Sequence, residues 1–264
     1  MTPASLAALP QTLLSRIEDA GLNASAPPQQ RWLDGWLLRF SPGKAKRARC
    51  INAVAEGQLS LDEKLALAQR AYRDAGLPLF VRITPFSRPA SLDARLAGLG
   101  LVSIDDTRVM VCDELSPIAT PTLPPGVSCL PLPHSAFAQT VGRLRGSPLA
   151  QRQAHAQRLD NSPVPFLGFA LKRDDDAAVL ACGQFALEDE LVGLYDVFTA
   201  EAARGQGLAR LLCQHLLADA RARGSRVAYL QVEGDNAAAR SVYLRLGFND
   251  AYAYHYRCAA ADAV

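Results

Sequence analysis

The pattern of apolar and polar positions predicts a run of strands in the second half of the chain. The segments "PFLGFALK", "AVLACGQFAL" and "LVGLYDVFT", within residues 165–199, are mainly apolar. The acidic turn Asp174–Asp176 and the turn "EDE" separate them. Because short polar turns between consecutive strands favour hairpin pairing, we expect an antiparallel meander.

From Gly207 onward the apolar period becomes that of a helix. Leucines recur at i, i+3, i+4 and i+8 from position 208, which places them on one helical face, and Gly224 ends the pattern. The strand "RVAYLQV", the helix "DNAAARSVYLRLG" and the strand "DAYAYHYRC" follow, and two short helices are expected over residues 134–159. The order strand, helix, strand predicts a right-handed crossover between parallel neighbours.

A proline-rich segment divides the chain into two parts of similar length. "LSPIATPTLPPG", residues 115–126, contains four prolines and has the composition of a connector. We therefore expect a domain over residues 1–115, a linker over 116–126 and a second domain over 127–264.

Composition narrows the class of protein. The chain has 264 residues, with 28 basic and 26 acidic side chains, so bulk electrostatics gives no reason to expect a nucleic-acid or membrane partner. Six scattered cysteines lack the short spacings of a metal or redox site, which predicts core cysteines and no metal. Neither a signal peptide pattern nor a long apolar run is present, and we expect a cytoplasmic protein.

The start of the long helix is the strongest candidate site. Its first N–H groups lack partners within the helix and lie at the positive end of the helix dipole. The two glycines of Arg204–Gly207 would let a phosphate approach these groups, and Arg204 adds a positive charge. A diphosphate suits this place, although a glycine pair can also make only a tight turn.

Two motifs in this region resemble those of the GNAT acetyltransferase superfamily. Arg204–Ala209 matches the R-x-x-G-x-A form of the acetyl-CoA loop. The N-x-x-A-x-x-x-Y-x-x-x-G-F stretch is matched by Asn236, Ala239, Tyr243, Gly247 and Phe248. The resemblance covers residues 126–257 and implies an α/β fold, with a mixed, mostly antiparallel central sheet flanked by helices, and acetyl-CoA (coenzyme A) as acyl donor.

The resemblance also implies roles for individual residues. The pantetheine arm would lie along a splayed strand at Val197–Thr199 and bond its backbone, and Asn236 would contact the same arm. The loop around Arg204 and Gly205 would hold the pyrophosphate on backbone amides, namely those of Gln206, Gly207, Ala209 and Arg210. Tyr243 would protonate the leaving thiolate as a general acid, unless it is only a core aromatic.

The general base is open at this point. Gln231 stands where several members of the superfamily carry a basic glutamate, and the other frequent glutamate position falls near Gly193. Glu233, Asp196 and His255 are the remaining candidates. Glu233 shares a strand face with Gln231, whereas Asp196 lies beside the expected splay. Each of the three can equally be structural.

The first half of the chain can be aligned with the second as a repeat. Gly57-Gln58 falls on Gly205-Gln206, and Gly100-Leu101 falls on Gly247-Phe248. The first half does not keep the motif residues of the second half. The alignment replaces Arg204, Gly207, Asn236 and Tyr243 with Glu56, Leu59, Pro89 and Leu96, respectively. This predicts a GNAT-like half that lost its cofactor site, similar to tandem GNAT proteins of the mycothiol synthase type.

A basic hairpin lies in this first half. "DGWLLRFSPGKAKRARCINAV" places four cations at its tip: Lys44, Lys46, Arg47 and Arg49. They could hold an acidic acceptor or the CoA ribose phosphate, but such a run is more often a solvated tip, which we expect here. Trp32 and Trp36 are expected to pack in the core or between the halves.

These observations favour an N-acetyltransferase that moves an acetyl group to a primary amine, on a small molecule or a protein, by direct attack in a ternary complex. A non-catalytic acyl-CoA-binding regulator is the alternative, and Gln231 favours it. An interaction module without a ligand is a third hypothesis, which the intact loop and Tyr243 disfavour. The acceptor and the oligomeric state are open, and a homodimer is compatible with the sequence.

Overall fold

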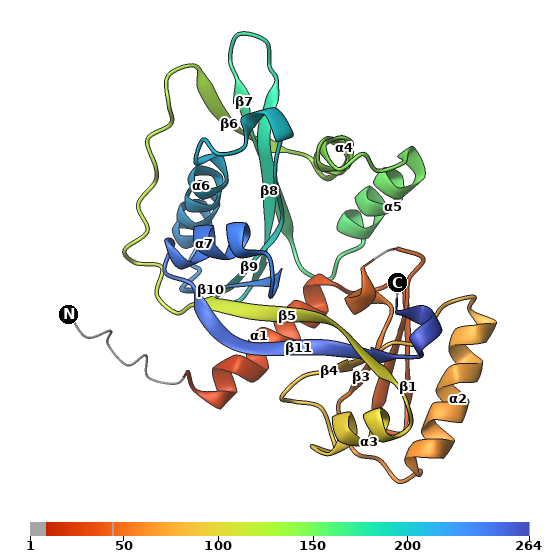
Figure 1. Cartoon of the computed structure of the whole chain (residues 1–264). Coiled ribbons are helices and arrows are strands. Elements are labelled where there is room, and N and C mark those ends of the chain that lie inside the picture. The colour runs from red at the N-terminus through yellow and green to blue at the C-terminus, as the bar shows by residue number, and fades with distance from the viewer. Residues whose placement is uncertain (1–8, 44, 264) are drawn as a thin grey trace.

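One continuous sheet runs through the whole molecule. The computed structural model describes residues 9–43 and 45–263, so Lys44 of the basic hairpin lies outside the described residues. Eleven strands pair in the order β1-β2-β3-β4-β11-β5-β10-β9-β8-β7-β6. Helices flank this sheet, as Figure 1 shows, and the expected α/β fold with a mixed, mostly antiparallel sheet is confirmed.

The elements of the first half are α1 (Gln11–Ala24), β1 (Gln29–Leu33), β2 (Trp36–Phe40), η1 (Lys46–Ala48), β3 (Ile51–Ala53), α2 (Leu61–Asp74), β4 (Val81–Ile83), α3 (Leu92–Gly98) and β5 (Val102–Cys112). Those of the second half are β6 (Val127–Leu132), α4 (His134–Leu144), α5 (Leu149–Asp160), β7 (Phe166–Arg173), β8 (Val179–Glu188), β9 (Leu191–Thr199), η2 (Glu201–Ala203), α6 (Leu208–Ala222), β10 (Val227–Glu233), α7 (Ala237–Leu244), β11 (Asn249–Cys258) and η3 (Ala260–Asp262).

Each half contains the same parallel unit. β3 and β4 pair in parallel across α2, and β9 and β10 pair in parallel across α6, while the other strand pairs are antiparallel. The predicted meander is present as β7-β8-β9, and the predicted parallel crossover is present as β9-α6-β10.

The last strand of each half lies against the other half. β5 sits between β10 and β11, and β11 sits between β4 and β5. Gln231 is thereby paired with Val109, and His255 with Ile83. In Figure 1, β5 and β11 run side by side between the two parts of the molecule. The two halves are therefore joined through backbone hydrogen bonds as well as side-chain packing.

The two faces of the second-half sheet bury different side chains. Ala228, Leu230 and Val232 of β10 pack in the cluster that contains the apolar face of α6. Val227 and Tyr229, on the opposite face, pack with α1. This alternation is that of a strand buried on both sides. It places α6 and α7 on one face, and α1 on the other with α4 and α5 beside it.

The packing predictions for tryptophan and cysteine were right in part. Trp36 is 1% exposed and lies in the core of the first half, but Trp32 is 63% exposed, so its predicted packing role is wrong. Trp32 lies on β1, an edge strand whose side chains are mostly exposed. Five of the six cysteines are buried and Cys129 is half-buried.

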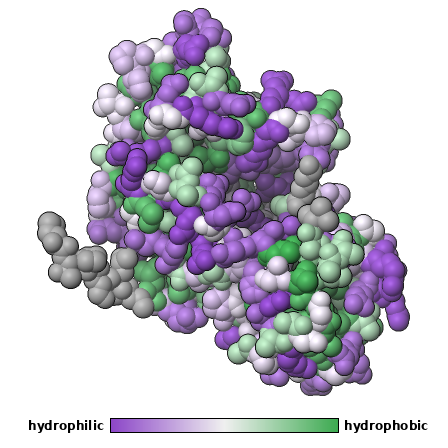
Figure 2. Space-filling model, in the orientation of Figure 1, coloured by the Kyte–Doolittle hydropathy of each residue, from purple (hydrophilic) through white to green (hydrophobic). Residues whose placement is uncertain are grey.

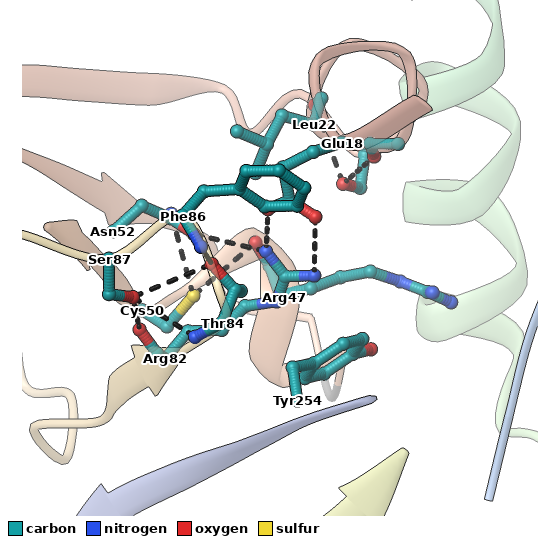
Figure 3. A network of polar contacts seen from close by, with 12 residues as sticks. Glu18, Leu22, Arg47, Cys50, Asn52, Arg82, Thr84, Phe86, Ser87 and Tyr254 are labelled. Atoms are coloured by element: carbon teal, nitrogen blue, oxygen red, sulfur yellow. Dashed lines mark hydrogen bonds and ion pairs between the residues drawn. The ribbon is translucent and has the colours of Figure 1, made fainter. Parts of the chain in front are cut away.

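A buried polar network joins α1 to the strands of both halves (Figure 3). Glu18 of α1 forms an ion pair with Arg82 of β4, and Arg82 Nη2 donates to Glu18 Oε2 at 3.1 Å. The Tyr252 hydroxyl of β11 donates to the same carboxylate at 2.7 Å, and the Arg82 guanidinium lies 3.9 Å from the Tyr254 ring centroid. Such a pair is tolerated in a core because each charge is compensated.

Among the described residues, no helix is long and apolar enough to cross a membrane. A cytoplasmic location stays a prediction.

Candidate functional site

A bulge in β9 opens the sheet beside β10. Tyr195 of β9 pairs with Gln184 of β8 and Phe198 pairs with Cys182, so two residues of β9 stand opposite Gly183. Asp196, within this bulge, has φ +52°, which is uncommon for a residue with a side chain. β10 pairs with β9 only as far as Leu194. The β9 segment Val197–Thr199 therefore offers one backbone edge to a ligand, as the resemblance implies.

The glycine loop at the start of α6 has open amides. Gly205 and Gly207 have φ values of +76° and +75°, and a Cβ on either would meet no atom within 4 Å. Within residues 9–43 and 45–263, the N–H groups of Gln206 and Gly207 have no hydrogen-bond acceptor. Ala209 and Arg210 are in the first helical turn, where amides have no intrahelical partner. The loop can thus present several N–H groups to one anion.

The glycine loop before α2 in the first half holds a carboxylate of the chain itself. The amide of Gln58 donates to Asp34 Oδ1 at 2.9 Å, and the amide of Leu59 donates to Asp34 Oδ2 at 2.8 Å. Lys64 pairs with this carboxylate at 3.0 Å. Hydrogen bonds from the Gln58 and Leu59 amides hold the pKa of Asp34 below its usual value. An internal anion thus fills the loop that aligns with Arg204–Ala209.

Arg204 and Phe198 border the open loop. The Arg204 guanidinium lies 5.9 Å from the Phe198 ring centroid, and the Arg204 side chain has no ion pair among the described residues. Arg145, at the end of α4, lies 5.7 Å from the same ring. Two cations therefore flank the segment that follows the bulge.

Asn236 and Tyr243 are both on α7. The Asn236 side-chain oxygen accepts from the Ala239 amide at 3.1 Å and caps the helix, so its NH₂ group is the part left to donate to a ligand. Tyr243 is half-buried against the α6 cluster, with its ring centroid 6.0 Å from that of Phe248. Burial raises the pKa of the Tyr243 hydroxyl, which therefore holds its proton near neutral pH.

Asp196 is fully engaged. Its oxygens accept from Arg145 Nη1 at 2.8 Å and Gln184 Nε2 at 2.6 Å, and His155 Nε2 lies 3.3 Å away. Burial opposes ionisation of the carboxyl, but the His155 contact and the charges of Arg145 and Arg158 outweigh it and hold the pKa of Asp196 far below its usual value. A carboxylate in this state accepts a proton poorly.

The other base candidates lie in different surroundings. Glu233 is exposed at the end of β10 and has no ion pair among the residues described. His255 is held by Asp93 of α3, with Nε2 2.8 Å from Asp93 Oδ1, so the structure does not bring it to the bulge. Gln231 accepts hydrogen bonds from the Tyr254 hydroxyl at 2.8 Å and from Arg47 Nη1 at 2.5 Å.

The contact of Arg47 with Gln231 corrects the expectation of a solvated basic tip. Arg47 is half-buried and reaches from η1 of the first half to β10 of the second. Lys46 pairs with Asp105 at 2.9 Å. The sequence shows a run of cations but not the partner, because 184 residues separate Arg47 from Gln231.

Comparisons with known proteins point to one superfamily. A family model described as "Probable histone acetyltransferase Rv0428c C-terminal" matches residues 14–258. The chain is 27% identical to "Uncharacterized N-acetyltransferase YobR" of Bacillus subtilis over 233 residues, covering 86% of this chain and 91% of that protein. It is 34% identical over 91 residues to a "[Ribosomal protein bS18]-alanine N-acetyltransferase" of Salmonella typhimurium, covering 34% of this chain and 60% of that protein.

Solved structures show the same fold at low identity. A "GCN5-related N-acetyltransferase" from Kribbella flavida has a TM-score of 0.68 and 15% identity, with 93% of this chain and 95% of that chain covered. A "Tandem GNAT protein from the clavulanic acid biosynthesis pathway" has a TM-score of 0.63 and 16% identity, with 75% and 69% covered.

Proposed function

We propose that this chain, a GNAT-superfamily N-acetyltransferase that belongs to the family described as probable histone acetyltransferase Rv0428c C-terminal, transfers an acetyl group from acetyl-CoA to a primary amine in a ternary complex. The family membership and the fold confirm the resemblance expected from the two motifs. The identity of the donor, the direct attack and the residue roles are the proposed part.

The observation that carries the proposal is the contrast between the two glycine loops. In the first half the loop amides are bonded to Asp34, whereas in the second half the amides of Gln206 and Gly207 are open and Arg204 stands beside them. An anion of the donor would complete the second loop. The diphosphate would lie on these amides, and the pantetheine arm along Val197–Thr199 and Asn236.

The chain's own groups would move two protons. Acetyl-CoA supplies a thioester, whose C–S bond breaks as the C–N bond of the amide forms. Tyr243, which keeps its proton near neutral pH, would donate it to the departing thiolate, and the proton that the attacking nitrogen loses as the amide forms would restore the Tyr243 hydroxyl. An amine nucleophile must first lose a proton, since its reference pKa is about 10.4. We assign that step to the exposed carboxylate of Glu233, through water, and assign Asp196 to holding Arg145 and His155 in place.

The first half would be a GNAT-like unit without a donor site, consistent with the assignment of residues 1–115 and 127–264 as two domains around a linker. Glu56 and Asp34 put negative charge where a diphosphate would lie, and like charges repel. Its role in the enzyme is to supply Arg47 and α1 to the face opposite α6.

Steady-state release of the CoA thiol with a panel of primary amines tests the proposal. We expect turnover by the wild type and a loss in kcat of about 10²–10⁴-fold in Tyr243→Phe, with acetyl-CoA affinity kept. Tyr256→Phe is the matched control, because Tyr256 is also buried and its hydroxyl has no hydrogen bond among the described residues. Binding of acetyl-CoA without turnover of any amine would instead favour the regulator.

A further inference from the structure

Two guanidinium groups converge beside the β9 bulge from opposite halves of the chain. Arg47 of η1 lies 5.8 Å from the Tyr195 ring centroid. Arg158 of α5 lies 5.8 Å from the Phe166 ring centroid. The Phe166 and Tyr195 rings are themselves 5.6 Å apart. The buried Phe166 ring and the half-buried Tyr195 ring thus lie between the two cations, next to the residue that opens the sheet.

The positive charge at this place is compensated only in part, by the charge of Asp196. Neither Arg47 nor Arg158 forms an ion pair within the part of the chain that the structure describes. Asp196, the carboxylate within reach, is already bonded to Arg145 and close to His155. Burial and the charge of Arg47 lower the pKa of Arg158, so the two cations act on each other. The charge of Asp196 favours the protonated form of both groups, so two neighbouring guanidinium cations are held where an anion can join them.

The position of Arg47 is built by the fold. Arg39, only 1% exposed, donates from its guanidinium to the carbonyl of Arg47 at 3.1 Å and to the carbonyls of Leu22 and Ser25 at 2.9 and 2.8 Å. These bonds attach η1 to the end of α1. In Figure 3 the Arg47 side chain extends out of the buried network toward a helix of the second half.

The surrounding surface is concave. Figure 2 shows a hollow between the part that carries α4 and α5 and the part that carries η1 and α2, and hydrophilic residues gather around it. Asp196 of β9 and Gln231 of β10 lie between this hollow and the place where β9 and β10 separate. The proposed donor would end at that place.

We propose that the amine acceptor carries an anionic group, a carboxylate or a phosphate, and that Arg47 and Arg158 bind this group beside the β9 bulge. The inference rests on the proposed function, whose amine acceptor it narrows. Guanidinium groups suit both anions, because they donate paired hydrogen bonds in one plane. A polybasic acceptor would bring further positive charge beside two neighbouring cations and would be repelled.

The test uses matched sets of primary amines. Within one set the chain length is constant and the far end is a carboxylate, a phosphonate, a methyl group or a second ammonium. Sets of several chain lengths are compared. We expect kcat/KM to be about 10- to 100-fold higher for an anionic end than for methyl, and lowest for ammonium. The carboxylate and phosphonate arms decide which anion is preferred. Arg158→Gln should remove most of the preference and Arg158→Lys should retain part of it, while Arg70→Gln, an exposed arginine on α2, should leave it unchanged.

The outcomes separate this inference from the proposed function. Turnover that is equal for all ends, or best with the diamine, would overturn the anionic acceptor and leave the acetyltransferase intact. A preference that survives in both Arg47→Gln and Arg158→Gln would overturn the assignment to these residues. If no amine turns over, the proposed function fails. Calorimetric titration of glutarate and of phosphate into the CoA-loaded protein then tests the anion site by itself. Binding that Arg158→Gln abolishes supports the anion site, and no binding overturns it.

Discussion

The Glu18–Arg82 ion pair of the first half, to which Tyr252 of β11 donates, offers the sharpest test of the buried polar network. The Glu18 and Arg82 side chains are 10% and 2% exposed, so both charges are removed from water. Glu18→Gln keeps the size of the side chain and removes the charge. It leaves Arg82 buried without its carboxylate, and it weakens the hydrogen bond from the Tyr252 hydroxyl.

The expected loss of stability follows from this burial. Breaking a buried ion pair by removing one partner costs roughly 3–5 kcal/mol. Arg82 retains its position 3.9 Å from the Tyr254 ring centroid, and a desolvated contact of this kind is worth about 2 kcal/mol. We therefore expect the lower end, about 3 kcal/mol. At about 2–4 °C per kcal/mol for a chain of this size, Tm should fall by roughly 6–12 °C.

Urea unfolding followed by tryptophan fluorescence and by far-UV circular dichroism measures the effect, and the two transitions should coincide because β5 and β11 join the halves. Arg223→Ala removes an exposed pair with Asp219 and should cost less than about 1 kcal/mol. The double variant Glu18→Leu/Arg82→Met should be more stable than Glu18→Gln. A cost below about 1 kcal/mol for Glu18→Gln would refute the reasoning.

Three further predictions concern the two loops and the bulge. Gly207→Ala, at φ +75° with open space for its Cβ, should fold with a penalty of about 1–2 kcal/mol but lose acetyl-CoA affinity in calorimetry; unchanged affinity would contradict the loop assignment. The fold lowers the pKa of Asp34, so its ionised carboxylate contributes to folding stability above the unfolded pKa near 3.9, and this contribution is lost as pH falls. The stability difference between wild type and Asp34→Asn should therefore shrink below about pH 4. A difference that grows there would contradict the assignment. The same sign applies to Asp196, and Asp196→Asn should cost about 1–3 kcal/mol at pH 7 in urea unfolding, whereas a neutral effect would show that its contacts add nothing.

The local structure of the second half could be predicted well from the sequence. Apolar alternation and the leucine spacing of α6 are short-range signals, and Gly207 and Gly224 mark its ends. The exchange of β5 and β11 could not be predicted, because a strand pattern does not specify a distant partner. β6 follows the proline-rich segment and contains Pro131, which weakens the strand signal on an edge.

The candidate site divides in the same way. The loop glycines and Tyr243 lie in motifs, so their positions were expected. The left-handed conformation of Asp196 depends on the register between β8 and β9, and the place of Arg47 depends on bonds from Arg39. Such tertiary contacts decide which member of a basic run is buried, and composition does not record them.

Calorimetric titration of acetyl-CoA tests the central claim most directly, namely that the chain has one donor site at the start of α6. The wild type should bind one equivalent, and Arg204→Glu, which introduces the charge that Glu56 carries in the first half, should abolish binding. Arg70→Glu on the exposed face of α2 is the matched control and should bind as the wild type does. Two equivalents, or binding that Arg204→Glu leaves unchanged, would contradict the account.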